Sequence, residues 1–444
     1  MTSDSLTEQI TRDGPPSASP ASPVAAGSPN TSHFPSDGND SRASIERLSL
    51  GLEVLAFRWF WDKLGGPPLR VRLQSGFELT APLESSRGTI VIRDRRTLHR
   101  LYLQPSLAFG EAFSRGDLQI EGDLVDVLVA LNQQMAAARP GSWLSSLLQW
   151  RIRNRKSHSI ADSRRSVHHH YDIGNDFYRL WLDEQLLYTC AYYARPELSL
   201  EQAQIAKMDH ICRKLQLQPG QSVVEAGCGW GALALHMARH YGVTVQAYNL
   251  SHEQILYARQ RASDEGLAAR VEFIEDDYRT ARGPCDIFVS VGMLEHVGLE
   301  NFQALGRVID RVLKKTGRGL IHSIGRNRAR PLDPWIDRYI FPGAYPPSLR
   351  EMQAVFEPWT MSILDVENLR LHYAKTLVDW LARYEQAADE VLRMFDVQFV
   401  RTWRMYLAGS AAAFLGGDLQ LFQVVFTRHD NNDIPWTRTH LYET

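Results

Sequence analysis

The chain has 444 residues, of which 44% are hydrophobic, with 49 Lys or Arg and 51 Asp or Glu giving a formal net charge of -2. This length predicts two or three domains, and the apolar content excludes a chain that is disordered throughout. The balanced charge gives no sign of a nucleic-acid partner. Four cysteines without metal-ligand spacing exclude a disulfide framework and favour a reducing compartment. We find neither a signal peptide nor an apolar run of about 20 residues, so we expect a cytoplasmic protein.

The N-terminal part of the chain changes character near residue 46. Residues 1–45 are rich in Ser, Pro and Gly and contain one aromatic residue, which predicts a disordered tail. Residues 46–138 then show strand-like runs at 69–73 and 88–92 and a helical stretch over 98–113. This alternation predicts a small α+β N-terminal domain.

Residues 139–165 combine apolar anchors with a basic cluster. The apolar members are Trp143, Leu144, Leu147, Leu148 and Trp150, and the basic ones are Arg151, Arg153, Arg155, Lys156, Arg164 and Arg165. Such a basic amphipathic linker fits a segment that lies on an anionic membrane surface. It equally fits a solvated linker attached to an ordinary amphipathic helix.

From residue 166 to residue 444 strands and helices alternate. The predicted strands are 222–226, 243–249, 271–274, 286–291 and 319–324, with helices at 232–240 and 253–261. This order predicts an α/β fold with a mostly parallel sheet and helices on both faces. Residues 419–427 form one more strand, which is a candidate for an antiparallel edge.

A glycine-rich loop, Glu225-Ala226-Gly227-Cys228-Gly229-Trp230-Gly231, follows the strand at 222–226 and opens a helix. Glycines at this place let a ligand approach the backbone at the carboxyl edge of the sheet. A dinucleotide site fits less well, because the third glycine comes one residue early and the second strand ends at Asn249 without an acid. A purely structural turn is a further alternative. The loop resembles the cofactor loop of class I methyltransferases that use S-adenosylmethionine.

Six further motifs occur in a fixed order around this loop. They are 171–178 (YDIGNDFY), 188–193 (YTCAYY), 290–298 (SVGMLEHVG), 321–325 (IHSIG), 339–343 (YIFPG) and 367–373 (ENLRLHY). Together they resemble the cyclopropane-fatty-acyl-phospholipid synthase family, which includes the mycolic acid methyltransferases. The resemblance covers roughly residues 165–430 and extends weakly to 105–130. It implies a Rossmann-like class I methyltransferase domain preceded by a smaller domain.

The resemblance implies a reaction that moves a carbon from S-adenosylmethionine onto the double bond of an unsaturated phospholipid acyl chain. A carbocation forms, and a bound bicarbonate removes a proton so that a cyclopropane ring closes. One alternative outcome is a methyl-branched or methylene fatty acyl chain. A second alternative is a catalytically silent lipid-binding protein on the same scaffold, which the intact glycine loop disfavours.

The cofactor residues implied by the resemblance surround the glycine loop. They are Glu225, Gly227, Cys228, Gly229, Gly231, Gln254, Asp277 and Tyr278. The second strand continues as Tyr248-Asn249-Leu250-Ser251, where relatives often have Thr-Leu-Ser or Thr-Ile-Ser. Taken alone, Asp277 also fits an ordinary helix cap.

The bicarbonate residues implied by the resemblance are Glu295, His322 and Tyr373 through their side chains and Cys190 and Ile324 mainly through their backbone. A buried glutamate resists ionisation, so Glu295 needs donors nearby. Singly, Glu295 also fits an exposed helix acid and His322 a core histidine. No local feature lowers the thiol pKa of Cys190, so we expect no nucleophilic role. We expect no metal site either, because the consecutive histidines at 168–170 rarely converge on one ion.

The implied substrate points to a peripheral enzyme that docks transiently on an anionic membrane surface at the inner face of the membrane. A homodimer is a candidate assembly. Candidates for the acyl channel are Tyr171, Phe177, Tyr193, Phe341, Tyr345 and Trp380, each of which also fits plain core packing. Chain length, double-bond position and headgroup are not encoded in these patterns.

Overall fold

The computed structural model describes residues 54–80, 86–137 and 173–442. The predicted tail at 1–45 and the basic segment at 139–165 lie outside the described residues. Residues Glu53–Thr444 cluster as one compact unit, so the predicted boundary at residue 138 stays a prediction. No helix within the described ranges is long and apolar enough to cross a bilayer.

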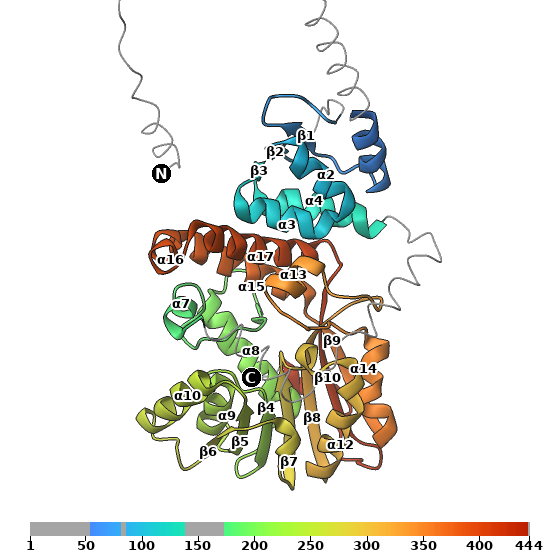
Figure 1. Cartoon of the computed structure of the whole chain (residues 1–444). Coiled ribbons are helices and arrows are strands. Elements are labelled where there is room, and N and C mark those ends of the chain that lie inside the picture. The colour runs from blue at the N-terminus through green and yellow to red at the C-terminus, as the bar shows by residue number, and fades with distance from the viewer. Residues whose placement is uncertain (1–53, 81–85, 138–172, 443–444) are drawn as a thin grey trace, which may run out of the picture. The chain divides into compact units, whose positions relative to one another are not determined.

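The first part of the described chain is built on a small three-stranded sheet (Figure 1). Its elements are a helical segment at 54–63, β1 (Arg70–Leu73), β2 (Thr89–Ile92), α2 (Arg95–Leu103), α3 (Pro105–Arg115), β3 (Leu118–Glu121) and α4 (Leu124–Ala137). Strand β2 pairs parallel to β1 and antiparallel to β3. The mixture of strands and helices agrees with the α+β prediction for this segment.

The helical stretch predicted over 98–113 is two helices. Helix α2 begins after Asp94, whose side chain accepts a hydrogen bond from the backbone nitrogen of Thr97. It ends at Gln104, which has a non-helical backbone with φ of -144°. The break follows from Pro105, because a proline disfavours the helical conformation of the residue before it and is well placed at the start of a helix.

The second sheet has seven strands in the order β6-β5-β4-β7-β8-β10-β9 (Figure 1). The strands are β4 (Ser222–Ala226), β5 (Thr244–Asn249), β6 (Val271–Glu275), β7 (Cys285–Val291), β8 (Leu313–Gly325), β9 (Met361–Asn368) and β10 (Gln420–Arg428). The first five strands in that order are mutually parallel, and β10 pairs antiparallel with both β8 and β9. The predicted mostly parallel sheet is confirmed.

The placement of the last strand at the edge of the sheet was wrong. Strand β10 is antiparallel, as predicted, but it lies between β8 and β9, and the edge strand is β9. Every residue of β10 except Arg428 is buried, whereas most residues of β9 are partly exposed. The nearly continuous apolar run in β10 is typical of an interior strand that is covered on both faces.

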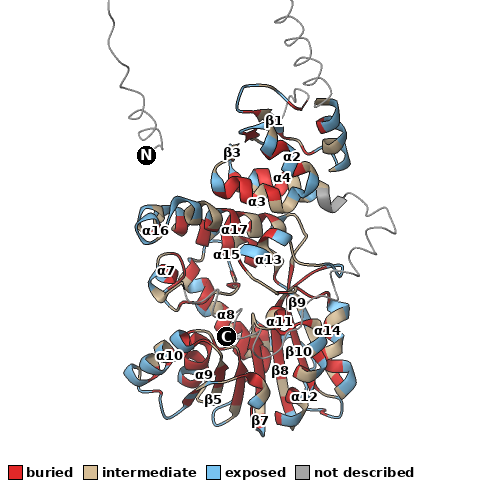
Figure 2. Ribbon diagram, in the orientation of Figure 1, coloured by how far each residue is buried: buried red, intermediate tan, exposed pale blue. Residues whose placement is uncertain are grey.

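Helices cover both faces of this sheet, and its strands form the buried centre in Figure 2. Helices α8 (Leu200–Leu215), α9 (Ala232–His240) and α10 (His252–Asp264) share one apolar core, and α12 (Phe302–Val312) and α14 (Leu349–Phe356) share the other. Helix α9 has the predicted bounds, and Gly242 follows it with φ of +67°. These layers are the ones expected of a Rossmann-like domain.

The remaining helices are short or lie beyond the sheet. They are α7 (Asn175–Arg179), η1 (Tyr278–Thr280), α11 (Leu294–Val297), η2 (Leu299–Asn301), α13 (Pro334–Tyr339), η3 (Glu357–Trp359), α15 (Arg370–Gln386), α16 (Ala388–Met394), α17 (Val397–Leu415) and η4 (Thr439–Leu441). Helix α17 packs against α15 and also against α3 and α4. It therefore connects the small sheet's helices with those of the larger domain.

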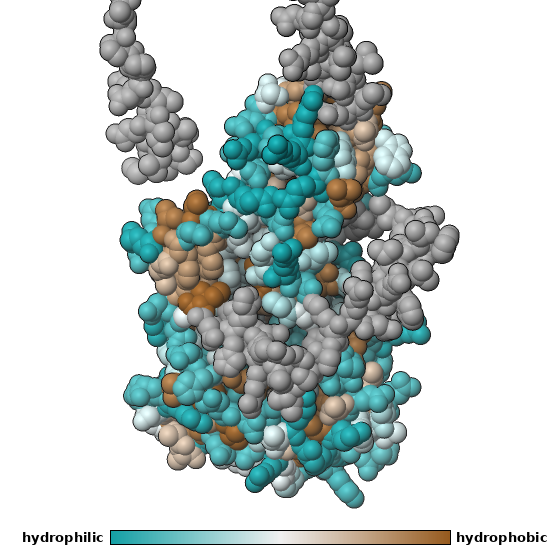
Figure 3. Space-filling model, viewed as in Figure 1, coloured by the Kyte–Doolittle hydropathy of each residue, from teal (hydrophilic) through white to brown (hydrophobic). Residues whose placement is uncertain are grey.

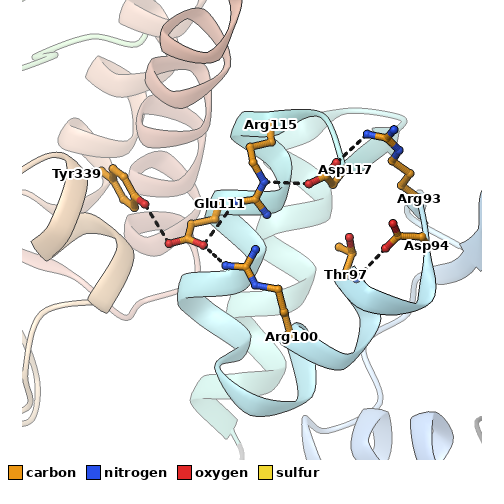
Figure 4. Close-up of polar contacts among 8 residues, drawn as sticks. All are labelled: Arg93, Asp94, Thr97, Arg100, Glu111, Arg115, Asp117 and Tyr339. Carbon is orange, nitrogen blue, oxygen red and sulfur yellow. Dashed lines mark hydrogen bonds and ion pairs between the residues drawn. The ribbon is translucent and has the colours of Figure 1, made fainter.

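A buried glutamate lies at the contact between α3 and α13 (Figure 4). Glu111 accepts a hydrogen bond from the hydroxyl of Tyr339 at 2.9 Å and pairs with Arg100 and Arg115 on its own side. Burial acts to raise the pKa of Glu111, but the hydrogen bonds from Tyr339 and Arg100 outweigh it and hold the pKa below its usual range. The folded protein therefore favours the ionised carboxylate.

We expect Glu111→Gln to lower the free energy of unfolding at pH 7 by about 1–2 kcal/mol, because the charged hydrogen bonds are lost while the arginines remain partly hydrated. The pKa of Glu111 is lower in the folded protein than its usual value, so the ionised carboxylate stabilises the fold at pH values above the ordinary carboxyl pKa. This stabilisation is lost as the pH falls through the pKa that Glu111 has in the folded protein. Urea unfolding at pH 7 and pH 4 should show the difference shrinking at the lower pH. The control is Glu121→Gln, which removes an exposed pair with Arg72 and should change stability by less than about 0.5 kcal/mol. Equal losses in the two variants would contradict this prediction.

Candidate active site

The glycine loop lies between β4 and α9 at the carboxyl edge of the parallel strands. Gly227, Gly229 and Gly231 all have positive φ, at +86°, +54° and +84°. A Cβ on Gly231 would lie 2.6 Å from the Phe273 ring, so a side chain there is excluded by contact as well as by conformation. The loop is anchored because the backbone nitrogens of Gly227 and Cys228 both donate to the carbonyl oxygen of Tyr248.

A cavity of about 150 Å³ adjoins this loop. Its wall includes Glu225, Gly227, Cys228, Gly229 and Gln254 among the predicted cofactor residues. Burial raises the pKa of Glu225 to about 8, and its Oε2 has no hydrogen-bond partner among the described residues. An unpaired buried carboxyl of this kind fits a ligand that brings a positive group.

Three predicted cofactor residues do not line this cavity. Gly231 precedes the first residue of α9, and its role is the close packing of that helix start. Asp277 accepts a hydrogen bond from the backbone nitrogen of Arg279 at 2.9 Å, which is the capping role considered for it. Tyr278 belongs to the apolar core on the α12 face. Both lie just after β6, two strands away from the glycine loop.

A larger cavity of about 610 Å³ contains the predicted bicarbonate residues. Cys190, Glu295, His322, Ile324 and Tyr373 all line it. They come from the loop before α8, from α11, from β8 and from α15, so segments far apart in the sequence line the same cavity. The structure thus brings the five predicted residues together.

Glu295 is buried on the first turn of α11, directly after β7. Its Oε1 accepts a hydrogen bond from the backbone nitrogen of Ile324 at 2.5 Å, and within the described chain its Oε2 has no partner. Burial raises the pKa of Glu295 to about 7. The carboxyl group therefore titrates near neutral pH, which suits a group that takes part in proton transfer.

His322 faces the same cavity from β8. Its Nδ1 lies 3.1 Å from Nε2 of Gln423, which stands opposite it on β10. In this arrangement, with the amide nitrogen of Gln423 turned toward the ring, Nδ1 accepts and the proton of the neutral ring lies on Nε2. Burial lowers the pKa of His322 well below its usual range, so the ring is neutral at pH 7. Nε2 is buried and has no hydrogen-bond partner in the described part of the chain.

Cys190 and Tyr373 also line this cavity. The Cys190 thiol donates to the carbonyl oxygen of Ala191 at 3.1 Å, and burial raises the pKa of the thiol far above its usual range. The thiolate needed for nucleophilic attack is therefore disfavoured. Tyr373 packs edge-on to Trp380 and against Phe414, with ring centroids 6.0 and 4.7 Å apart.

The rest of the large cavity is mostly apolar. Its wall combines Phe57, Ile90, Ile92 and Leu128 from the small-sheet region with Leu377, Met405, Gly409, Ala413 and Phe414 from α15 and α17. Of the channel candidates only Phe341 lines it, and Tyr171 lies outside the described residues. Phe177, Tyr193, Tyr345 and Trp380 do not line it. Phe177 instead packs in an aromatic cluster 4.9 Å from Trp403, and the Tyr193 hydroxyl donates to Asp379.

The two cavities meet. Tyr188, Thr189, Gly292, His296 and Phe341 line both of them. A group bound against the glycine loop is therefore adjacent to the polar wall that carries Glu295 and His322. This is the arrangement needed to pass a small group from one ligand to another while water is excluded.

Comparison with known proteins agrees with this geometry. Residues 158–424 match the family described as Mycolic acid cyclopropane synthetase. The chain belongs to this family. It is 35% identical to a probable fatty acid methyltransferase of Pseudomonas putida, over 84% of this chain and 96% of that protein. It is 36% identical to the cyclopropane-fatty-acyl-phospholipid synthase of Escherichia coli K12, over 79% of this chain and 90% of that one.

Among solved structures, the mycolic acid cyclopropane synthase CmaA1 in complex with SAH and CTAB superposes with a TM-score of 0.57 at 30% identity, covering 60% of this chain and 98% of that one. Family membership makes this chain an enzyme, a methyltransferase dependent on S-adenosylmethionine. The Rossmann-like fold class predicted from the sequence is confirmed.

Three residues of this methyltransferase site were missed at the level of sequence. Gln423 interrupts the apolar run of β10 with a polar, fully buried side chain, and this interruption was a usable signal. Asn249 donates to the Gly229 carbonyl oxygen at 3.2 Å and to Oε1 of Gln254 at 2.7 Å, which connects the glycine loop with α10. Lys207 is buried on α8 and lines the smaller cavity. Helical periodicity alone does not distinguish it from a surface lysine.

Proposed function

We propose that this enzyme forms cyclopropane rings in the unsaturated acyl chains of membrane phospholipids. One observation carries the proposal. Glu295 and His322, whose Oε2 and Nε2 atoms are buried without a partner among the described residues, line a large apolar cavity that shares lining residues with the cofactor cavity. A reaction that adds a carbon to an apolar chain and then removes a proton needs this combination.

The glycine loop fits S-adenosylmethionine because the residues of the loop line the smaller cavity. Glu225 Oε2, which has no hydrogen-bond partner among the described residues, suits the ammonium of the methionine part. Gln254, held by Asn249, would contact the ribose. Asp277 and Tyr278 remain proposals for the adenine side. When bound, the cofactor supplies an electrophilic methyl on a sulfonium.

In the proposed reaction the electron pair of the double bond would form a new bond to the methyl carbon as the methyl–sulfur bond breaks and leaves its electron pair on the sulfur of S-adenosylhomocysteine. A carbocation would remain on the neighbouring carbon. Loss of one proton from that methyl then leaves an electron pair that closes the ring. A bicarbonate ion would supply the proton acceptor. The neutral His322 would donate from Nε2 to hold such an anion, and Glu295 would accept the proton from it through Oε2.

An anionic lipid fits the polar end of the large cavity as well. Arg326 is buried in the cavity wall and donates to the carbonyl oxygens of Arg330 and Pro331, while its Nε is without a partner in the described ranges. Burial lowers the pKa of Arg326 to about 10, so it remains charged at neutral pH. The apolar remainder of the cavity suits an acyl chain.

Figure 3 shows apolar side chains gathered on the surface around α16 and the start of α17. Leu392, Met394 and Val397 are exposed there, and Arg393 lies among them. Because α17 continues inward to line the large cavity, we place transient membrane docking at this end of the helix. The enzyme would then work from the cytoplasmic side of the membrane. The predicted homodimer stays a prediction.

The test is to incubate the purified enzyme with S-adenosylmethionine and anionic liposomes of monounsaturated phospholipid, and to analyse the lipids by mass spectrometry. We expect each modified chain to gain one CH₂ unit and lose its double bond to a ring, and we expect the protein to sediment with the liposomes. The same mass gain with a double bond retained would instead establish a branching methyltransferase. Binding of S-adenosylhomocysteine without any change in the lipids would favour a silent lipid-binding protein.

A further inference from the structure

We propose that Lys207 binds the carboxylate of the cofactor's methionine part and so acts, opposite Glu225, as a specificity residue of the cofactor site. The proposal rests on S-adenosylmethionine being the cofactor and assigns its methionine part to two side chains of opposite charge. Both side chains line the cavity of about 150 Å³ beside the glycine loop.

Lys207 is almost completely buried, with 1% of its side chain exposed, and it projects from the middle of α8. Its ammonium donates to Oγ1 of Thr189 at 2.8 Å. Thr189 lines both cavities, so this hydrogen bond directs the positive charge to the place where they meet. Because an ammonium has three donors, one neutral hydroxyl leaves most of its hydrogen-bonding capacity unused.

Glu225, the acidic side chain in this cavity, also lacks a close partner of opposite charge within the described chain. Glu225 is 2% exposed, and among the residues that the structure describes neither Glu225 nor Lys207 forms an ion pair within 4.0 Å. Burial lowers the pKa of Lys207 to about 8 and raises that of Glu225 to about 8, so each group is destabilised in its charged form. Asp183 and Glu225 act on Lys207 as opposite charges without forming a close ion pair, and they offset only part of the effect of burial on its pKa.

A buried charge without a partner is costly, and a ligand of the opposite charge removes that cost on binding. The amino-acid end of the cofactor carries one ammonium and one carboxylate, so it matches Glu225 and Lys207 together. Gln204, which lies on α8 like Lys207, holds the loop that carries Thr189. Its side-chain nitrogen donates to the carbonyl oxygens of Leu187 and Thr189 at 3.2 and 3.0 Å.

The experiment is isothermal titration calorimetry of wild type and Lys207→Met with three ligands. S-adenosylhomocysteine has the complete amino-acid end, S-adenosyl-3-thiopropylamine lacks only the carboxylate, and 5′-methylthioadenosine lacks both charges. We expect Lys207→Met to weaken binding of S-adenosylhomocysteine by about 10- to 100-fold, as for loss of one partner of a desolvated charge pair. Binding of the other two ligands should change by less than about threefold.

Lys214→Met is the matched control. Lys214 is a second buried lysine on α8, but it pairs with Glu367 at 2.6 Å and lies outside the cofactor cavity. This variant should leave the affinity for all three ligands within about threefold of wild type. If Lys207→Met does not fold, Thr189→Val is the variant that tests the proposal, because it removes the hydroxyl that accepts from the Lys207 ammonium. It should weaken the binding of S-adenosylhomocysteine by a smaller factor and leave the binding of the other two ligands unchanged.

Equal weakening of all three ligands by Lys207→Met would show a merely structural role and overturn the proposal, as would unchanged binding of S-adenosylhomocysteine. Failure of the cofactor assignment on which this proposal rests looks different, because the wild-type enzyme itself would then bind none of the three ligands. Failure of the proposed ring formation appears in the lipid products, while the wild type still binds S-adenosylhomocysteine.

Discussion

Replacing Glu295 by glutamine is expected to lower the rate of product formation by about 10²- to 10⁴-fold, the range typical of losing a proton-transfer group. Glutamine retains an acceptor for the backbone nitrogen of Ile324 but cannot take up a proton. Binding of S-adenosylhomocysteine should stay within about threefold of wild type, because Glu295 lines the large cavity and not the cofactor cavity. Turnover and calorimetry on the same preparation measure the two quantities.

The pH dependence of the rate provides a second readout for this glutamate. Burial raises the pKa of Glu295 to about 7, and the proposed role requires the deprotonated form. The wild-type rate should therefore rise between pH 6 and pH 8, and the glutamine variant should lack this rise. Glu300→Gln, which changes an exposed acid outside the cavity wall, is the control and should behave like wild type. A glutamine variant with the full wild-type rate would remove Glu295 from the mechanism.

The parts of the site that could be predicted from the sequence are those that local chemistry dictates. The glycines of the loop were recognisable because a tight turn at a sheet edge needs positive φ, and all three adopt it. Glu295 and His322 were predicted through the ordered motifs, and the structure places them on one cavity wall. Pro105, by contrast, was overlooked as the break between two helices, although its effect on the preceding residue is local.

The parts that could not be predicted depend on packing between distant segments. The apolar cavity is formed where α17 packs against α3 and α4, which brings Ile90 and Leu128 to the same space as Met405 and Phe414. No single segment carries a pattern for such a space. For the same reason aromatic character was a poor guide to the channel, because a side chain such as Trp380 is equally suited to a core, where it is fully buried.

Filling the large cavity from α17 is the second change with a large expected effect. Gly409 lines the cavity from the interior of α17, and a Cβ at this position would meet no atom within 4 Å. We expect Gly409→Leu to fold and to lower product formation on 18-carbon chains by more than about tenfold, because its side chain occupies the space proposed for the acyl chain. Shorter monounsaturated chains should be affected less, and mass spectrometry of mixed-chain liposomes reads out this shift.

Gly409→Ala separates the effect of the cavity from the effect on the helix. Alanine in place of an interior helical glycine stabilises a helix by about 0.5–1 kcal/mol, and a single methyl group leaves most of the cavity open. This variant should therefore unfold at higher temperature while its chain-length preference stays that of wild type. If Gly409→Leu also kept the wild-type preference, the acyl chain would have to bind elsewhere. The cavity lined by Glu295 and His322 would then be a space that the substrate does not fill.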